Sequence, residues 1–93
     1  MSSVDETLST RGSRYGEFAD VANLTAELYG AMCEKMQDRD EFEPYHIEAI
    51  HMICQKLARA VCGDPMYPDN WHDIGGYAKL VENEINKVPA VQR

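Results

Sequence analysis

The sequence predicts an all-α fold, a small helical bundle of three main helices that is completed by oligomerisation. Three observations support this prediction. Apolar residues recur at three- and four-residue steps in three separate segments, no segment alternates with period two, and proline or glycine stands near the segment ends. A chain of 93 residues is near the lower size limit for a self-sufficient core, so we expect one domain.

The N-terminal residues carry no apolar periodicity. Residues 1–10 are polar and acidic, and we expect them to form a flexible tail. Residues 11–93 then form a single helical domain, in which residues 11–16 are a short arm that leads into the first helix.

The first helix is predicted over residues 17–36, where six apolar residues form a stripe: Phe18, Val21, Leu24, Leu28, Met32 and Met36. The second is predicted over residues 44–62, with Pro44 in its first turn and Gly63 as the C-cap residue. It has the most regular stripe in the chain and further apolar residues beside that stripe. Because it is hydrophobic on more than one side, we expect it at the centre of the bundle.

The third helix is predicted over residues 70–88, with Asp69 or Asn70 as its N-cap and Pro89 after its end. Its interior contains Gly75 and Gly76, although glycine in a helix interior costs roughly 0.5–1 kcal/mol relative to alanine. We interpret the pair as a site of close approach by the neighbouring helix or by a ligand. Three amphipathic helices bury little surface alone, so a homo-oligomer is expected.

Composition excludes several classes of protein. The formal net charge is −7, which disfavours binding of duplex nucleic acid. No apolar run is long enough for a membrane span, and the polar N-terminus does not resemble a secretion signal. Three cysteines without C-x-x-C spacing indicate reduced thiols rather than a zinc site or a disulfide framework. We therefore expect a cytoplasmic protein, and no membrane partner.

Four of the nine basic residues stand in two short motifs. Arg11, Arg14, Tyr15 and Phe18 lie together just before or at the start of the first helix. Guanidinium groups, helix-start N–H groups and an aromatic ring can bind a phosphate and a base. The alternative is that the two aromatic residues only pack and the arginines are solvated.

The second and third helices carry the other polar residues of interest. Lys56 and Arg59, three residues apart, are expected to share a face of the second helix. Asp69, Asp73 and Tyr77 stand at four-residue steps on the third. The two aspartates can hold magnesium, or they can cap the helix and accept hydrogen bonds from Lys56 and Arg59.

The stretches RYGEF, KLARAVCGDP and DNWHDIGGYAKL, in this order, resemble a family of small proteins of unknown function from tailed phages and prophages. The resemblance covers most of the chain from Arg11 to Leu80. Its pattern is matched by Arg11, Tyr15, Gly16, Lys56, Arg59, Asp69, Trp71, Asp73, Gly76 and Tyr77. That arrangement is similar to the MazG-type nucleotide pyrophosphohydrolases, all-α proteins that assemble as dimers or larger and bind nucleotides between helices.

The chain departs from the MazG pattern at its acidic motifs. Those hydrolases hold magnesium with E-E-x-x-E on one helix and E-x-x-D on the next. Here the second helix offers only Glu48, and Asn70 stands where the later motif has glutamate. Because asparagine adds no charge and is a weak magnesium ligand, most of the metal cluster for hydrolysis is missing.

The resemblance and this departure together suggest a phage accessory protein that binds a nucleotide without turnover. One such role is sequestration of a host defence messenger, either a cyclic oligonucleotide or an NAD-derived signal. No cofactor and no catalytic residue are expected. The candidate ligand-binding residues are Arg11, Arg14, Tyr15, Phe18, Lys56, Arg59, Asp69, Asn70, Trp71, Asp73 and Tyr77.

Two alternatives remain open at this point. One is a Mg²⁺-dependent pyrophosphohydrolase of the MazG type, with Glu48, Asp69 and Asp73 as metal ligands. The other is a non-nucleotide interaction protein, whose basic residues serve only as salt-bridge partners.

Overall fold

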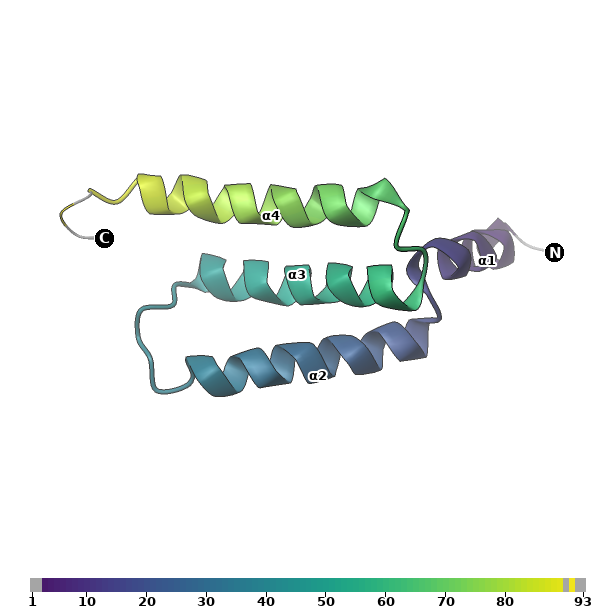
Figure 1. Cartoon of the computed structure of the whole chain (residues 1–93), viewed down its shortest axis with the longest axis horizontal. Helices are drawn as coiled ribbons and strands as arrows, with labels where there is room; N and C mark the ends of the chain where they lie inside the picture. Colours follow the sequence, from purple (N-terminus) through teal and green to yellow (C-terminus); the bar gives the residue numbers. More distant parts are fainter. Residues whose placement is uncertain (1–2, 90, 92–93) are drawn as a thin grey trace.

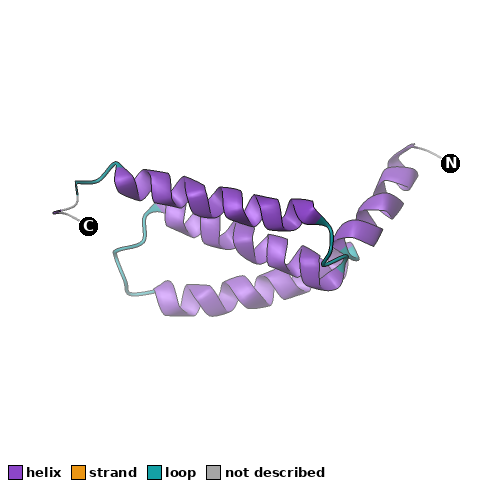
Figure 2. Ribbon diagram, turned by 45° about the horizontal axis from the view of Figure 1, so that its top comes forward, coloured by secondary structure: helices purple, strands orange, loops and turns teal. Residues whose placement is uncertain are grey.

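The computed structural model describes residues 3–89 and 91 and consists of four helices joined by short loops (Figure 1). The helices are α1 (Ser3–Tyr15), α2 (Phe18–Met36), α3 (Pro44–Cys62) and α4 (Pro68–Asn86). Helix and loop account for all of the described residues, with no strand among them (Figure 2). The all-α class predicted from the sequence is therefore confirmed.

Helix α3 has the bounds that the sequence predicts. Pro44 is the first helical residue, where its missing N–H needs no partner, and Gly63 is the C-cap. A capping box closes the N-terminus of α3. The backbone N–H of Glu43 donates to Nδ1 of His46 over 3.0 Å, and the Glu43 side chain accepts from the backbone N–H of His46.

Helix α4 begins two residues before its predicted start. Pro68 takes its first position, as Pro44 does in α3, and Tyr67 is the N-cap residue. The prediction of Asp69 or Asn70 as the N-cap is wrong. Asp69 lies in the first turn, where its charge favours the helix dipole, and the Asn70 side chain is buried.

Helix α1 is the largest difference from the sequence prediction, which has three helices and treats residues 1–16 as tail and arm. Its ends complement the helix dipole, with Asp5 and Glu6 in the first turn and Arg14 in the last. It ends where the N–H of Gly16 donates to the carbonyl of Gly12 over 2.9 Å. Only sparse apolar residues mark α1 in the sequence, so hydrophobic periodicity does not reveal it.

Helix α3 lies between α2 and α4 and packs along both, as the sequence predicts for its two-sided apolar surface (Figure 1). Helix α1 leaves one end of this layer at an angle, and the molecule extends 58 Å along its longest axis (Figure 2). None of the helices in the described part of the chain is long and apolar enough to cross a membrane.

The core is small. Its buried apolar side chains are Val21, Ala49, Cys54, Ala58 and Ala60, four of them on α3. Phe18, predicted as part of the apolar stripe of the first helix, is instead 87% exposed and lines the groove described below.

Candidate ligand-binding groove

The segment that joins α1 to α2 lies against the segment that joins α3 to α4, and we call this contact the crossing. Gly16 has a φ of +89°, and a Cβ added to it would lie 2.6 Å from Cβ of Cys62. A Cβ added to Gly63 would lie 2.5 Å from the carbonyl oxygen of Arg14. The N–H of Asp64 donates to that same carbonyl over 3.0 Å. These contacts, which only glycine permits, fix the end of α1 against the end of α3.

This crossing brings two predicted ligand-binding residues, Arg11 and Arg59, to a third, the Tyr15 ring. The guanidinium carbons of Arg11 and Arg59 lie 5.0 Å and 5.1 Å from the ring centroid, within the range of cation–π attraction. Tyr67 meets the ring edge-on, with centroids 5.6 Å apart. Arg11 comes from α1 and Arg59 from α3, so residues 48 positions apart in the sequence converge.

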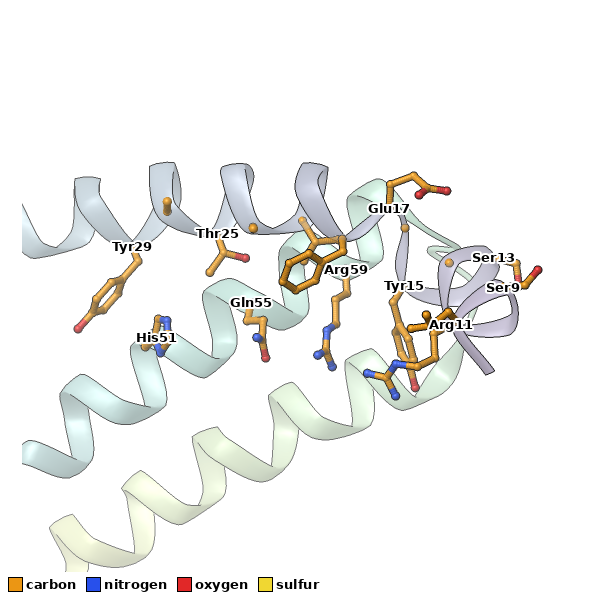
Figure 3. Close-up of a pocket in the computed structure, with 17 residues that line it drawn as sticks. Ser9, Arg11, Ser13, Tyr15, Glu17, Thr25, Tyr29, His51, Gln55 and Arg59 are labelled. Carbon is orange, nitrogen blue, oxygen red and sulfur yellow. The ribbon is translucent and has the colours of Figure 1, made fainter. Parts of the chain in front are cut away.

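An open groove of about 1140 Å³ extends from this cluster along α2 (Figure 3). Helices α1, α2 and α3 all contribute to its lining. One wall is mainly apolar and includes Leu8, Phe18, Val21, Ala22 and Ala26. The polar side chains of the lining include Arg11 from α1, Thr25 from α2, and His51, Gln55 and Arg59 from α3. An apolar wall with a few polar groups is the usual character of a small-molecule site.

The charge of the groove is opposite to that of the whole chain. Neither Arg11 nor Arg59 makes an ion pair with a carboxylate of the described residues, although the net charge is −7. Glu17 at the rim is the one acidic residue in the lining. Two guanidinium groups without an ion pair among the described residues make the α1 end of the groove suited to an anion, although the charge of Arg59 also contributes to the lowered pKa of Asp73.

The groove contains a polar atom without a hydrogen-bond partner. Thr25 of α2 is 9% exposed, and within the described chain its hydroxyl has no hydrogen-bond partner. Leaving a buried hydroxyl unpaired costs about 1–3 kcal/mol. A ligand or water that reaches this atom would recover that cost.

Two of the predicted basic residues lie outside the groove. Arg14 places its guanidinium over the Tyr67 ring at 5.0 Å and donates to the Tyr67 hydroxyl over 3.2 Å. Lys56 forms an ion pair with Asp73 of α4 at 2.9 Å, and its side chain is only 12% exposed. Lys56 and Arg59 are neighbours on the surface of α3, some 60° apart, but Lys56 contacts Asp73 of α4 whereas Arg59 contacts the Tyr15 ring.

The α4 candidates are likewise engaged elsewhere. Asp69 accepts a hydrogen bond from the Tyr67 hydroxyl over 3.1 Å, and this bond raises the pKa of Tyr67. The ion pair with Lys56 lowers the pKa of Asp73. Trp71 is half exposed and donates its indole N–H to the carbonyl of Pro65 over 2.8 Å. Tyr77 lines a separate small hollow of about 280 Å³ with Asp73.

Asn70 is 1% exposed, and its side-chain nitrogen and oxygen are both unpaired within the described residues. It does not line the groove. The structure therefore separates the eleven candidates into two groups: Arg11, Tyr15, Phe18 and Arg59 line the groove, whereas the other seven do not.

Sequence reasoning missed several residues of the groove. His51 and Gln55 lie on the polar side of α3 near Arg59, as the sequence indicates, but their four-residue steps to Arg59 were not used to assign them to the site. The Tyr29 ring lies 4.6 Å from that of His51, and a hydrogen bond with Cys33 raises the pKa of Tyr29. Thr25 gives no signal, because one threonine inside an apolar stripe is common.

The thiols and carboxylates of the described residues do not form a metal site. Cys33, Cys54 and Cys62 are free, and burial raises the pKa of the Cys54 thiol. Across the part of the chain that the structure describes, no three His, Cys, Asp or Glu side chains cluster as a metal site.

Comparisons with known proteins gave no match to a family model, to a curated protein or to a solved structure. The resemblance to a phage family and to MazG-type hydrolases therefore stays a prediction from the motifs.

Proposed function

We propose that this chain binds a small nucleotide in the groove and does not turn it over. The proposal rests above all on one observation: Arg11 and Arg59, free of ion pairs within the described residues, converge on Tyr15 at the end of a groove with an apolar wall. The two guanidinium groups would bind phosphate, each charge-assisted hydrogen bond contributing roughly 1.5–3 kcal/mol. The base would lie against the wall that begins at Phe18.

The geometry changes the role we assign to Tyr15. The sequence suggests that its ring stacks on a base, but two guanidinium groups already lie over that ring. Tyr15 is better suited to hold the arginines in place, which reduces the entropy they lose on binding. Tyr29, a further aromatic residue of the lining, lies against His51 with ring centroids 4.6 Å apart, so we assign the base to Phe18, which is 87% exposed at the groove.

Binding is favoured over hydrolysis by the partners of the acidic residues. Asp73 is paired with Lys56, and Asp69 accepts a hydrogen bond from Tyr67. A magnesium ion at these carboxylates would have to displace both interactions. The proposed role, sequestration of a cyclic or NAD-derived host signal in the cytoplasm, further depends on the phage resemblance. The chain would act as a homo-oligomer.

A calorimetric screen of cyclic di- and trinucleotides and NAD-derived nucleotides tests the proposal. We expect one ligand that binds in the micromolar range or tighter and is recovered intact after incubation with Mg²⁺ and heat denaturation of the protein. Arg11→Ala and Arg59→Ala should each weaken binding at least about tenfold, or ~1.4 kcal/mol. Arg39→Ala is the matched control, because Arg39 also lies over an aromatic ring, that of Phe42, but outside the groove.

Two outcomes would contradict the proposal. If none of these nucleotides binds more tightly than about 100 μM, roughly 5.5 kcal/mol, the groove does not serve this ligand class. If a nucleotide is cleaved and Asp73→Ala abolishes cleavage, the chain is a hydrolase.

A further inference from the structure

Beyond its two arginines the groove continues into a part lined by uncharged polar side chains. Gln55 stands one helical turn before Arg59, about 6 Å away along α3, and Thr25 lines the same groove from α2. The Thr25 side chain is directed from α2 toward α3 (Figure 3). Among the described residues of the lining the only carboxylate is Glu17, which precedes the first residue of α2. We call the region of Thr25 and Gln55 the neutral part of the groove.

Both side chains of the neutral part have hydrogen-bonding groups that the protein leaves unused. Thr25 is 9% exposed, and its hydroxyl has no hydrogen-bond partner within the described residues. The amide of the half-buried Gln55 likewise makes no hydrogen bond there. A side-chain amide presents an N–H donor beside a carbonyl acceptor, and a hydroxyl can act as either. Because an unpaired buried polar group destabilises the fold, a ligand that supplies partners here is favoured.

We propose that the neutral part recognises the edge of the base and selects adenine. The inference rests on the proposed function, in which the arginines bind phosphate and the base lies against the wall that begins at Phe18. In a nucleotide one sugar separates the phosphate from the base, and the one-turn step from Arg59 to Gln55 suits that separation. With its face on Phe18, the base directs its edge toward the Gln55 amide.

The Gln55 amide complements adenine because this base presents the N6 amine, a donor, beside the N7 acceptor. The amide carbonyl accepts from N6 and the amide N–H donates to N7, while the Thr25 hydroxyl can donate to a further ring nitrogen. Guanine instead presents two acceptors, O6 and N7, which a guanidinium group binds best, and both guanidinium groups of the groove are assigned to phosphate. The N4 amine of cytosine pairs best with a carboxylate, which the neutral part lacks among the described residues.

Three 5′-monophosphates that differ at the edge of the base test this selection: those of adenosine, inosine and 7-deazaadenosine. Inosine has a carbonyl oxygen in place of the N6 amine, and 7-deazaadenosine has a C–H group in place of N7. Ligand-observed NMR of the full chain, with each nucleotide at millimolar concentration, measures the three dissociation constants even where binding is weak. We expect the adenosine nucleotide to bind at least about tenfold more tightly than either analogue, because a bidentate contact to a base discriminates by this much.

Two variants assign the selection to the neutral part. Gln55→Leu removes the amide and should bring the three dissociation constants to within about threefold of one another. Gln37→Leu is the matched control, because Gln37 is exposed at the C-cap of α2 and does not line the groove, and it should leave the preference intact. Thr25→Val should weaken binding of the adenosine nucleotide about threefold or more without lowering the midpoint of urea unfolding, because the hydroxyl that it removes has no partner in the described chain.

The outcomes separate this inference from the proposed function. Equal binding of the three nucleotides, or a preference that Gln55→Leu leaves intact, overturns the selection of adenine but not nucleotide binding. If none of the three binds, the inference is also overturned, and the calorimetric screen described above decides separately whether the groove binds nucleotides at all. An unchanged dissociation constant for Thr25→Val, or a lowered unfolding midpoint, overturns the contact assigned to Thr25.

Discussion

Two pairs of glycines occupy opposite situations in this molecule. At the crossing, a Cβ on Gly16 or Gly63 would overlap the backbone or side chain of another segment, at distances of 2.8 Å or less. In α4, a Cβ on Gly75 or Gly76 would meet nothing within 4 Å. The first pair is required by packing inside the chain. The second pair is exposed, and α3 does not approach it closely, contrary to one of the two expectations from the sequence.

This difference shows that a position can require glycine for more than one physical reason. Gly16 needs both its positive φ and its lack of a side chain, whereas Gly63, with a φ of −113°, needs only the second. The C-cap role inferred for Gly63 gives the right helix end, but a close backbone contact rather than left-handed geometry explains the residue.

Substitutions of the glycines at the crossing should destabilise the fold more than any other change considered below. Gly16→Ala combines a strained φ, which costs about 1–3 kcal/mol, with overlap against Cys62, which costs about 1–3 kcal/mol more. We expect a loss of about 2–6 kcal/mol in unfolding free energy, measured by urea denaturation, and a smaller loss of about 1–3 kcal/mol for Gly63→Ala, where only the overlap contributes. Gly12→Ala is the control, because its Cβ would lie 3.8 Å from the nearest atom, and it should be neutral or stabilising. A loss below 1 kcal/mol for Gly16→Ala would show that the crossing is loose.

Beside the crossing, the Tyr67 hydroxyl links α1 to α4 by accepting from Arg14 and donating to Asp69. Tyr67→Phe removes both bonds, so we expect a loss of about 0.5–1.5 kcal/mol in thermal or urea unfolding. Tyr77→Phe should change stability less, because the Tyr77 hydroxyl has no hydrogen-bond partner in the described chain. Equal effects of the two variants would contradict a linking role for Tyr67.

Substitutions of the two glycines in α4 should stabilise the fold. Gly75→Ala and Gly76→Ala should each raise the unfolding free energy by about 0.5–1 kcal/mol, because alanine favours the helix and meets no neighbour. The measurement is made at the lowest concentration that gives a signal. Destabilisation that grows with protein concentration would show that another copy contacts this face.

The smallest expected effect concerns the ion pair between α4 and α3. Lys56 lowers the pKa of Asp73, so the ion pair stabilises the fold above the ordinary aspartate pKa, about 3.9. That contribution is lost as the pH falls through the lower pKa of the folded state. Asp73→Asn should therefore flatten stability against pH between about 5 and 2. An unchanged slope would show that the pair contributes nothing.

Much of the fold follows from local signals in the sequence. Pro44 and Gly63 define both ends of α3, and the two-sided apolar surface of α3 predicts its central place. Pro68 likewise marks the first turn of α4, but the sequence prediction used the polar residues after it, Asp69 and Asn70, as the helix start. Helix α1 could not be predicted from periodicity, because its apolar residues are sparse; its visible signals are charges that match the helix dipole, Asp5 and Glu6 in the first turn and Arg14 in the last.

The candidate site could be predicted only in part, because it depends on a contact between distant segments. The motifs identify Arg11, Tyr15 and Arg59, but their convergence results from the Gly16–Gly63 crossing, which no local pattern reveals. The sequence also grouped Lys56 with Arg59 in the site. Their three-residue spacing does not show that Lys56 contacts α4 instead, where it pairs with Asp73.

Helix α1 is attached to the bundle through its last turn, near Tyr15 and Gly16, and Val4 and Leu8 further along it are more than 60% exposed. Its first half is therefore an arm whose amide hydrogens are shielded only by the bonds of the helix itself. Those hydrogens should exchange with deuterated solvent quickly in the free chain. Whatever docks between α1 and α2 should slow that exchange, which makes α1 a built-in reporter of occupancy that requires no label.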